Sequence, residues 1–489
     1  MKTRISSLII PRLQDILFFA IFIAVLGLGQ RMLNIDGDLP RHLATGRLII
    51  QTGTIPTVEP FAYPYEGQLY VSHEWLTDVG FYLIDQYLGL TGVIVLSAAL
   101  LATTFTTIFS FLTRRQDIRV PILILIIWGA AVTSLNWAAR PFLISMLLLA
   151  IWLTWTDKLS RGEKIPLWAF FVTMAIWSNL HGEFIAGMLV TIAYTAGWTM
   201  DFIFRSEKPD VKTGQRLWLS LLLSAMASLI NPAGFRPWLT ILGFVNNRYL
   251  MSHMVESNSP NFQQPQFLVL LGLLIISIIL LVIKPKKIST GQAFLLAGFS
   301  AMSLMAARNI HLYGVVAPFV LSETVGEIAQ SRIFNSAEVI LRKIESQLKG
   351  ILWPLATTIG LGILLLTGKT GMTYSFGPSV FPVNAVTWLE THPQEGRMFN
   401  DLDWGGYIEH RLLLEQKVFV DSMADVTGQL TQQYETVLTM SNGWQDIFTK
   451  YHIAWIIMPS DSNLIRTLSA DPTWTVIYAD STATILRQK

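Results

Sequence analysis

Two aspartates separated by one glycine, Asp36 and Asp38, stand directly after the first long apolar segment of the chain. Arg41 and His42 follow within the next four residues. A carboxylate can take a proton from an attacking acceptor by general-base catalysis, and the planar guanidinium of arginine can bind two phosphate oxygens at once. The pattern therefore predicts a site where Asp36 or Asp38 activates an acceptor and a cation neutralises a departing phosphate.

Further polar residues that could serve such a site recur between later apolar segments. The candidate phosphate ligands are Arg41, Arg140, Arg236 and Arg308. Arg308 is favoured among them because it opens a late apolar segment. Histidines could orient the phosphate and glutamates could hold the histidines; these candidates are His42, His73, His181, Glu74 and Glu183. Ionisable groups near membrane depth are costly, so their recurrence indicates a pathway or a site. Each group alone is equally consistent with an interfacial cap or a snorkelling side chain.

A divalent metal ion is a further candidate for this region. Carboxylates and imidazoles bind such ions, and the residues that qualify are Asp36, Asp38, His73, Glu74, His181 and Glu183. None of their spacings is diagnostic of a metal site. The tripeptide at 73–75 is equally consistent with a helix start and a tryptophan anchored at the membrane interface, so the sequence leaves the metal open.

The elements that must position these residues are membrane spans. Hydrophobic residues make up 52% of the 489-residue chain and charged residues 14%, against about 25% charged in soluble proteins. A spanning helix needs about 20 mainly apolar residues. We predict an α-helical polytopic membrane protein with a transmembrane domain over 1–370 and about eleven spans, near 15–33, 89–112, 119–137, 141–157, 166–178, 184–204, 217–230, 266–283, 290–307, 310–325 and 350–367. The net charge of +2 gives no indication of a nucleic-acid partner, and the absence of cysteine excludes disulfides and thiolate sites.

Lysines and arginines are divided unequally between the two sets of loops. Alternate loops that begin with the N-terminus hold 20 of them, and the opposite loops hold 7. Because these residues are enriched in cytoplasmic loops, we expect the N-terminus in the cytoplasm. An odd number of spans then places the C-terminal region outside, which predicts a multi-pass protein of the cell (inner) membrane.

The first outer loop, residues 34–88, is long and patterned. Residues 39–51 and 74–88 place apolar side chains at helical intervals among polar ones, which predicts two helices lying in the membrane interface. Glycine and prolines between them, at 53, 56 and 60, end the first helix.

The fifth predicted span is short. From Pro166 to Trp177 it has 12 residues, or about 18 Å of helix, against about 30 Å of hydrocarbon. The polar turn at 181–183 should therefore lie below the outer headgroups. Backbone at that depth is tolerated where it lines a cavity.

Residues 377–489 have a different character. Short apolar runs at 418–420, 453–458, 474–478 and 483–486 alternate with amphipathic segments, which predicts a small extracytoplasmic α/β domain. Four aspartates stand near the expected strand ends, namely Asp401, Asp403, Asp421 and Asp425. They are interpreted as helix caps and turns, with binding of a partner or acceptor as the functional alternative.

The acidic motif after the first span, the interfacial helix, the Gly53 to Pro56 break and the second interfacial helix resemble the GT-C superfamily of membrane glycosyltransferases. Its members include protein O-mannosyltransferases and the aminoarabinose transferases of lipid A. The resemblance places the catalytic aspartate at Asp36, but this chain has Asp-Gly-Asp where the familiar motif has Asp-Glu, which leaves Asp36 and Asp38 both open. Residues 404–407 (Trp-Gly-Gly-Tyr) and 418–422 (Val-Phe-Val-Asp-Ser) are similar to a recurring group of bacterial or archaeal polytopic membrane proteins.

The resemblance implies transfer of a sugar from a polyprenyl-phosphate-linked donor to an acceptor on the outer face. The acceptor would be a glycan, a lipid or a protein, and membrane lipids would surround the chain. Two alternatives use the same polar cavity without catalysis: a lipid or polysaccharide transporter or flippase, and a structural subunit of a membrane assembly. Broken half-helices in two corresponding repeats would favour transport, and the sequence has no convincing internal repeat.

Overall fold

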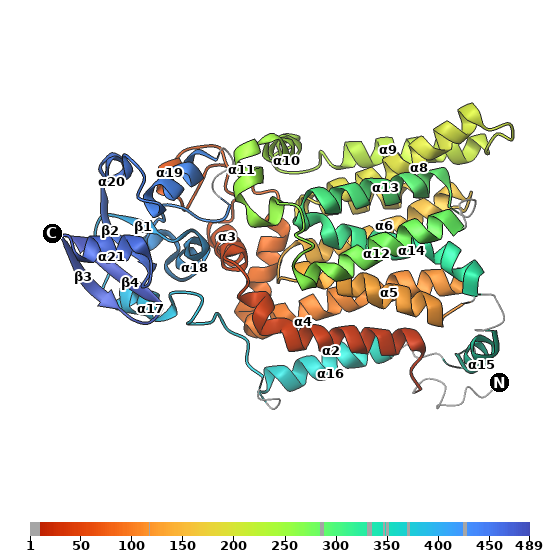
Figure 1. Ribbon diagram of the computed structural model, residues 1–489, viewed down its shortest axis with the longest axis horizontal. Coiled ribbons are helices and arrows are strands. Elements are labelled where there is room, and N and C mark those ends of the chain that lie inside the picture. Colours follow the sequence, from red (N-terminus) through yellow and green to blue (C-terminus); the bar gives the residue numbers. More distant parts are fainter. Residues whose placement is uncertain are drawn as a thin grey trace.

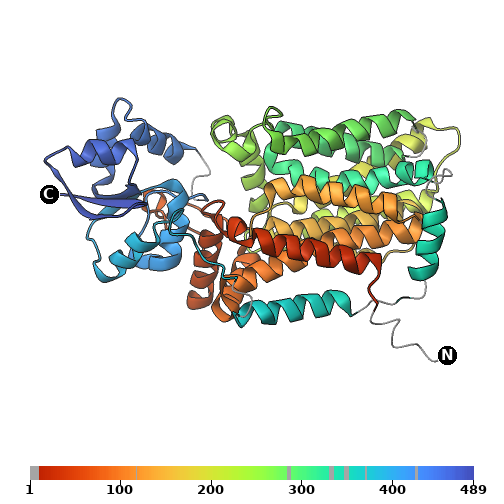
Figure 2. The same cartoon turned by 60° about the horizontal axis from the view of Figure 1, so that its bottom comes forward.

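The computed structural model describes residues 10–116, 118–283, 288–329, 335–345, 348, 352–368, 372–423 and 428–489. It consists of an elongated helical bundle and a smaller domain at one end of the bundle (Figure 1). A second view shows the same two parts, with the C-terminus in the small domain (Figure 2). Asp425 lies outside the described residues.

Each of the eleven predicted spans contains a helix. These helices are α2 (Leu13–Leu33), α4 (Trp75–Gln116), α5 (Val120–Thr133), α6 (Phe142–Ser160), α7 (Leu167–Leu180), α8 (Phe184–Phe204), α9 (Val211–Ala227), α12 (Leu268–Ile283), α13 (Thr290–Met305), α14 (Ile310–Ala329) and α16 (Trp353–Leu366). Among the described residues, four helical segments are long and apolar enough to cross a membrane: Leu13–Leu33, Trp75–Gln116, Phe142–Ser160 and Pro265–Ile283. The last leaves Ile275, Ile278 and Val282 exposed, a surface suited to lipid rather than water.

Both helices predicted in the first outer loop are present. The first is α3 (Asp38–Thr52), which ends at Gly53 with a positive φ of 67°. The second forms the beginning of α4, which is interrupted at Gly89, where φ is 63° and ψ is −173°. That glycine lets the chain turn from the loop helix into the second span, because a side chain is strained at such a φ.

The small domain contains a four-stranded sheet in the order β1-β2-β4-β3. Strand β1 (Arg397–Asn400) pairs in parallel with β2 (Ile453–Pro459), while β4 (Ala483–Gln488) pairs antiparallel with both β2 and β3 (Trp474–Ala479). The helices of this domain are α17 (Val383–Thr391), α18 (Leu402–Leu412), α19 (Gln429–Leu438), α20 (Trp444–Tyr451) and α21 (Asn463–Ser469). The α/β architecture predicted for this region is therefore confirmed.

The prediction of a strand at 418–420 is wrong. Val418 instead forms an isolated parallel bridge with Ala62 of the first outer loop. The neighbouring Phe419 is fully buried, and its ring centroid lies 6.0 Å from that of Tyr63. A short buried apolar run looks the same in sequence whether it joins a sheet or packs against another domain. Strand β1 and helix α18 were not predicted.

Three further helices connect the long ones. Helices α10 (Arg236–Asn246) and α11 (Arg248–His253) follow α9 on the side of the small domain, and α15 (Asn335–Glu345) lies at the opposite end of the bundle (Figure 1). Helix α10 is amphipathic and leaves Leu239, Leu242 and Val245 exposed.

Candidate functional site

Segments far apart in the sequence meet at the end of the bundle that faces the small domain. The loop after α2 lies beside the loop before α6, because the backbone N–H of Ala139 donates to the carbonyl oxygen of Met32 at 3.1 Å. Two one-turn helices complete this end, η3 (Val255–Ser257) and η6 (Ala307–Asn309), and the backbone N–H of Ala307 donates to Asn258 at 2.8 Å. The loops that carry Asp36, Arg140 and Arg308 therefore converge at this end of the bundle.

Arg140 lies between the two aspartates predicted to act as base. Its Nη2 atom is 2.6 Å from Oδ2 of Asp36, and its Nη1 atom is 3.0 Å from Oδ2 of Asp38. Glu256 adds a third carboxylate at 3.3 Å from Nη1. We call these four residues the Arg140 cluster. The side chains of Arg140, Asp36 and Asp38 are 20%, 21% and 20% exposed, so a ligand can reach both the cation and the acids.

The pKa of Asp36 is raised to about 6. Burial is the main cause and the nearby charge of Asp38 adds to it, while Arg140 opposes both. A carboxylate whose pKa lies close to the working pH accepts a proton more effectively than one with an ordinary acidic pKa. Asp36 is thus suited to general-base work.

Arg308 lies next to the Arg140 cluster. Its Nη1 atom is 3.5 Å from Oε1 of Glu256, whose other oxygen contacts Arg140. The Arg308 guanidinium also lies over the ring of Phe244, 5.1 Å from the centroid, and the side chain is 42% exposed. Two arginines therefore flank one carboxylate at an accessible position beside the aspartate pair.

Three of the predicted histidines surround Glu74. Its Oε1 atom lies 3.2 Å from Nε2 of His181 and 3.5 Å from Nε2 of His73, and its Oε2 atom lies 3.7 Å from Nε2 of His42. We call these residues the histidine cluster. Burial alone would raise the pKa of Glu74, but His73, His181, His42 and Arg140 outweigh burial and lower it, so Glu74 is a carboxylate.

Asp78 completes this cluster and was not predicted as a site residue. It stands four residues after Glu74, on the same face of the helix, and its Oδ1 atom lies 2.7 Å from Nδ1 of His42. Burial opposes the charged form of His42, but Asp78, Glu74 and Asp38 raise its pKa to about 9. The helical spacing of the two acids was a signal that could have identified Asp78.

His181 connects the histidine cluster to Glu183. The Nδ1 atom of His181 is 2.9 Å from the Ser145 hydroxyl and 3.6 Å from Oε2 of Glu183. Burial lowers the pKa of His181, although Glu183 and Glu74 act in the opposite direction. His311, at the beginning of α14, contacts Oε1 of Glu183 through Nε2 at 2.8 Å.

The turn at 181–183 is held against the beginning of α4. The Trp75 indole donates to Oδ1 of Asn179 at 2.7 Å, and the Thr77 hydroxyl donates to the carbonyl oxygen of Leu180 at 2.6 Å. Asn231 donates to the carbonyl oxygen of Ser178 at 3.0 Å. These contacts hold the turn against the beginning of α4, and they bring His181 to Glu74.

Among the described residues, His42, Glu74 and Asp78 form a buried group whose ligand atoms all lie within 4.8 Å of one another. One imidazole and two carboxylates are a donor set that divalent metals accept. Both ring nitrogens of His42 already face carboxylates, however, so the group is also satisfied by a proton on His42. A metal ion at this position would have to replace that proton, because metals bind neutral imidazole.

Arg41 does not join the predicted phosphate ligands. Its Nη2 atom lies 3.1 Å from Glu59, and its Nη1 atom lies 2.9 Å from Glu409 and 3.4 Å from Asp421. The side chain is fully buried, with its guanidinium 4.3 Å from the ring centroid of Phe61. Arg41 therefore ties the first outer loop to the small domain, and we call it and these three acids the Arg41 cluster.

Arg236 also lies apart from the other candidates. It is exposed at the beginning of α10 and makes no ion pair within the described part of the chain. Its helix does reach the site, since Phe244 near the other end contacts Arg308.

Helix α18 of the small domain supports the turn that carries the aspartate pair. A Cβ atom on Gly37 would lie 2.3 Å from the carbonyl oxygen of Asp403, and one on Gly406 would lie 2.4 Å from the carbonyl oxygen of Gly37. Only glycine permits so close an approach of two backbones. The glycines of the Trp-Gly-Gly-Tyr motif and of Asp-Gly-Asp thus meet each other.

A cavity of about 450 Å³ opens beside Asp36, between the end of α2 and the small domain. Its lining includes Asp401, Asp403 and Asp461. Asp401 acts as the cap of α18, accepting from the backbone N–H of Asp403 at 3.0 Å, and accepts from the Tyr434 hydroxyl at 3.1 Å. The capping role expected for this aspartate is therefore present. Asp421 belongs to the Arg41 cluster.

Comparisons with known proteins were made by sequence and by structure. No protein-family model and no curated protein matches the chain. The structure resembles the oligosaccharyltransferase of Archaeoglobus fulgidus in its apo form, with a TM-score of 0.58 over 90% of this chain and 69% of that one, at 9% identity. ArnT from Cupriavidus metallidurans matches with TM-scores of 0.47, bound to undecaprenyl phosphate, and 0.48 in the apo state, over 96% of this chain and 97% of that one, at 15% and 14% identity.

Both proteins are GT-C glycosyltransferases. The resemblance predicted from the sequence is therefore confirmed at the level of the fold, and the likeness to the oligosaccharyltransferase carries that conclusion.

Proposed function

We propose that the chain is a membrane glycosyltransferase that moves a sugar from a polyprenyl-phosphate-linked donor to an acceptor on the outer face. The observation that carries the proposal is the position of Arg140, which joins Asp36 and Asp38 at an accessible end of the bundle. The two candidate bases for the acceptor thus lie at hydrogen-bond distance from Arg140, the candidate cation for the phosphate. The shared fold supports the reaction class, and the undecaprenyl phosphate held by ArnT suggests a donor lipid.

In the proposed reaction, an acceptor oxygen or nitrogen attacks the anomeric carbon of the sugar. The bond from that carbon to the phosphate oxygen breaks, and its electron pair stays on the phosphate. The acceptor proton passes to Asp36 or Asp38. Arg140 and Arg308 neutralise the phosphate as charge develops on it, so the products are a glycosylated acceptor and a polyprenyl phosphate.

The histidine cluster has a positioning role in this proposal. His42 carries a proton at neutral pH because its pKa is about 9, and it adds positive charge close to Asp38. His181 has a lowered pKa and can offer a neutral imidazole to a phosphate or sugar hydroxyl. Glu74 holds the imidazole rings of His42 and His181 in position through contacts with their Nε2 atoms.

The decisive experiment combines purified protein with undecaprenyl-phosphate-linked sugars and follows membrane acceptors by mass spectrometry. Asp36→Asn or Asp38→Asn should lower turnover by about 10²–10⁴-fold, the usual contribution of a general base, while the variant still folds and binds donor. Asp446→Asn, an exposed acid on α20, is the matched control and should retain full turnover. Full turnover in both site variants, or no donor binding by the natural chain, would refute the proposal.

Arg308 should act on donor binding. Arg308→Ala removes a phosphate ligand and should weaken donor binding, while Arg308→Lys should restore it only in part, because lysine lacks the planar fork of arginine. Unchanged donor affinity in Arg308→Ala would remove this residue from the donor site.

The proposal includes eleven spans, a cytoplasmic N-terminus and a small domain outside the cell membrane. Because the chain lacks cysteine, single cysteines can be placed at Glu395 in the small domain and at Lys164 between α6 and α7. In intact cells, an impermeant thiol reagent should label the first position, and it should label the second only after permeabilisation. The reverse pattern would contradict this orientation.

A further inference from the structure

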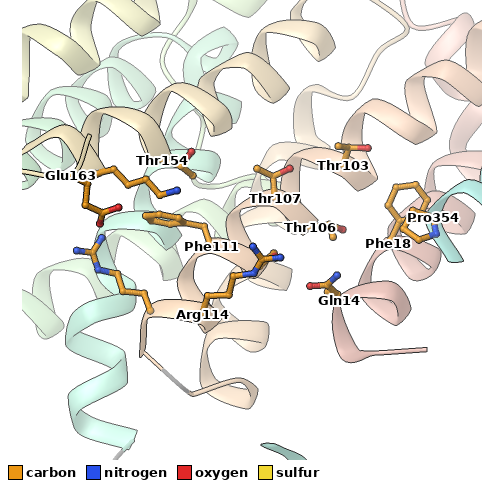
Figure 3. Close-up of a pocket in the computed structure, with 13 residues that line it drawn as sticks. Gln14, Phe18, Thr103, Thr106, Thr107, Phe111, Arg114, Thr154, Glu163 and Pro354 are labelled. Atoms are coloured by element: carbon orange, nitrogen blue, oxygen red, sulfur yellow. The ribbon is translucent and has the colours of Figure 1, made fainter. Parts of the chain in front are cut away.

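Figure 3 shows a second large cavity, of about 590 Å³. It lies at the end of the bundle opposite the Arg140 cluster, where α2 begins. It is bounded by the beginnings of α2 and α16 and by the ends of α4 and α6. Gln14 lines it at the start of α2, whereas Asp36 follows the end of that helix, about 30 Å away along a helix of this length. The proposed reaction makes no use of this cavity.

One wall of the cavity is a polar stripe on α4. Thr103, Thr106, Thr107 and Ser110 line it at intervals of three and four residues, which places them on one helix face. Figure 3 shows Thr103, Thr106 and Thr107 along this helix. The Thr106 hydroxyl is buried and has no hydrogen-bond partner among the described residues. Because an unpaired buried hydroxyl is costly, the cavity is suited to a polar occupant.

The mouth of the cavity is positively charged. Arg114, Arg115 and Lys158 line it, against the single carboxylate of Glu163 among its described lining residues. Arg115 is paired with Asp157. Arg114 and Lys158 form no ion pair with any described residue of the chain, and Arg114 is exposed. Lys158 lies over the ring of Phe111, 5.6 Å from its centroid. Since neither cation has a carboxylate partner among the described residues, both can bind an anion.

We propose that this cavity binds the phosphate-bearing headgroup of an anionic membrane lipid. The phosphate lies between Arg114 and Lys158, and hydroxyls of the headgroup meet the polar stripe, including Thr106. Phe18 and Pro354 form the apolar side of the cavity, where the lipid chains leave it along α2 and α16. Glycerophospholipids and polyprenyl phosphates share this chemistry, and the site is independent of the proposed reaction.

The test uses the full chain in phosphatidylcholine nanodiscs that contain photoreactive phosphatidylglycerol or photoreactive undecaprenyl phosphate. Peptide mapping by mass spectrometry then locates the labelled residues. Labelling is expected on residues 103–114 and 13–18. The double variant Arg114→Ala/Lys158→Ala should reduce it by about tenfold or more, since charge-assisted hydrogen bonds are lost. Arg205→Ala/Lys212→Ala, at the same end of the bundle but outside the cavity lining, should leave it unchanged.

A conservative variant provides a second test that does not depend on correct folding of the double variant. Thr106→Val keeps the side-chain shape and removes the unpaired hydroxyl, so it should raise the Tm in lipid-free detergent and still reduce labelling. Labelling by only one of the two lipids identifies the source of the phosphate. Equal labelling of this segment by photoreactive phosphatidylcholine, or unchanged labelling in both the double variant and Thr106→Val, would overturn the proposal.

Discussion

Two arginines of this protein each contact three carboxyl groups, but their side chains differ in exposure to solvent. Arg140 contacts Asp36, Asp38 and Glu256, and Arg41 contacts Glu59, Glu409 and Asp421. The side chain of Arg140 is 20% exposed, and that of Arg41 is fully buried. Access, rather than residue type or the number of partners, therefore separates a cluster that can bind a ligand from one that joins two parts of the chain.

The protonation of the acids differs as well. Burial raises the pKa of Glu409 well above its ordinary value, although Arg41 opposes this. Burial therefore disfavours the charged form of Glu409 more than Arg41 favours it. In the Arg140 cluster, Asp36 has a pKa of about 6, so it is mainly ionised at pH 7 and still able to accept a proton.

The largest expected effect is on stability, from Arg41→Ala. Removing one partner of a buried ion pair leaves uncompensated charge and typically costs about 3–5 kcal/mol. We expect a strongly lowered Tm and rapid proteolysis of the small domain. Glu409→Gln is the matched comparison and should cost less, because Arg41 keeps Glu59 and Asp421 as partners and burial already disfavours the charged form of Glu409. Equal loss of stability in both variants would show instead that the cluster depends on the charge of Glu409.

The next effect is on catalysis, from Arg140→Ala. Loss of one group that stabilises developing charge typically costs about 10²–10³-fold in kcat, and we expect this with only a small change in Tm because the site is open. Arg140→Lys should recover part of the rate, since it keeps the charge without the fork. If Arg140→Ala instead lowered the Tm as much as Arg41→Ala, the two clusters would have the same structural role.

The smallest effect concerns the histidine cluster and depends on pH. The pKa of His42 is about 9 in the folded protein, against 6.5 ordinarily. A raised pKa contributes stability that is complete below about pH 6.5 and is lost as the pH rises through 9. The Tm should therefore fall from pH 6.5 to pH 9, and His42→Gln should reduce this fall. His392→Gln, an exposed histidine of the small domain, should leave the fall intact.

Long periodic segments could be predicted from the sequence. The eleven apolar segments and the two helices of the first outer loop are helical at nearly the expected bounds, because hydrophobic periodicity of that length overrides local ambiguity. Short segments were less certain. The run at Val418–Val420 has the composition of a strand, but its pairing with Ala62 depends on a contact between regions more than 350 residues apart.

The residue types of the candidate site could also be predicted from the sequence. Which of the predicted residues belong to the Arg140 cluster and which to the Arg41 cluster could not. Asp36, Asp38, Arg140 and Arg308 come together as the shared chemistry suggested. Arg41 has the same chemistry and stands closer in sequence to the aspartates than Arg140 does, yet it points toward the small domain. Its partners Glu409 and Asp421 could not be chosen from the sequence, since tertiary packing alone determines which acids surround it.

The contact between Gly37 and Gly406 has a consequence for the order in which this protein matures. The turn that carries Asp36 and Asp38 is synthesised before the backbone that supports it, at Asp403 and Gly406, which follows more than 360 residues later. Both acids thus reach their final geometry only after the small domain has folded and docked. A product that ends before Asp403 therefore carries both acids without the backbone that supports their turn.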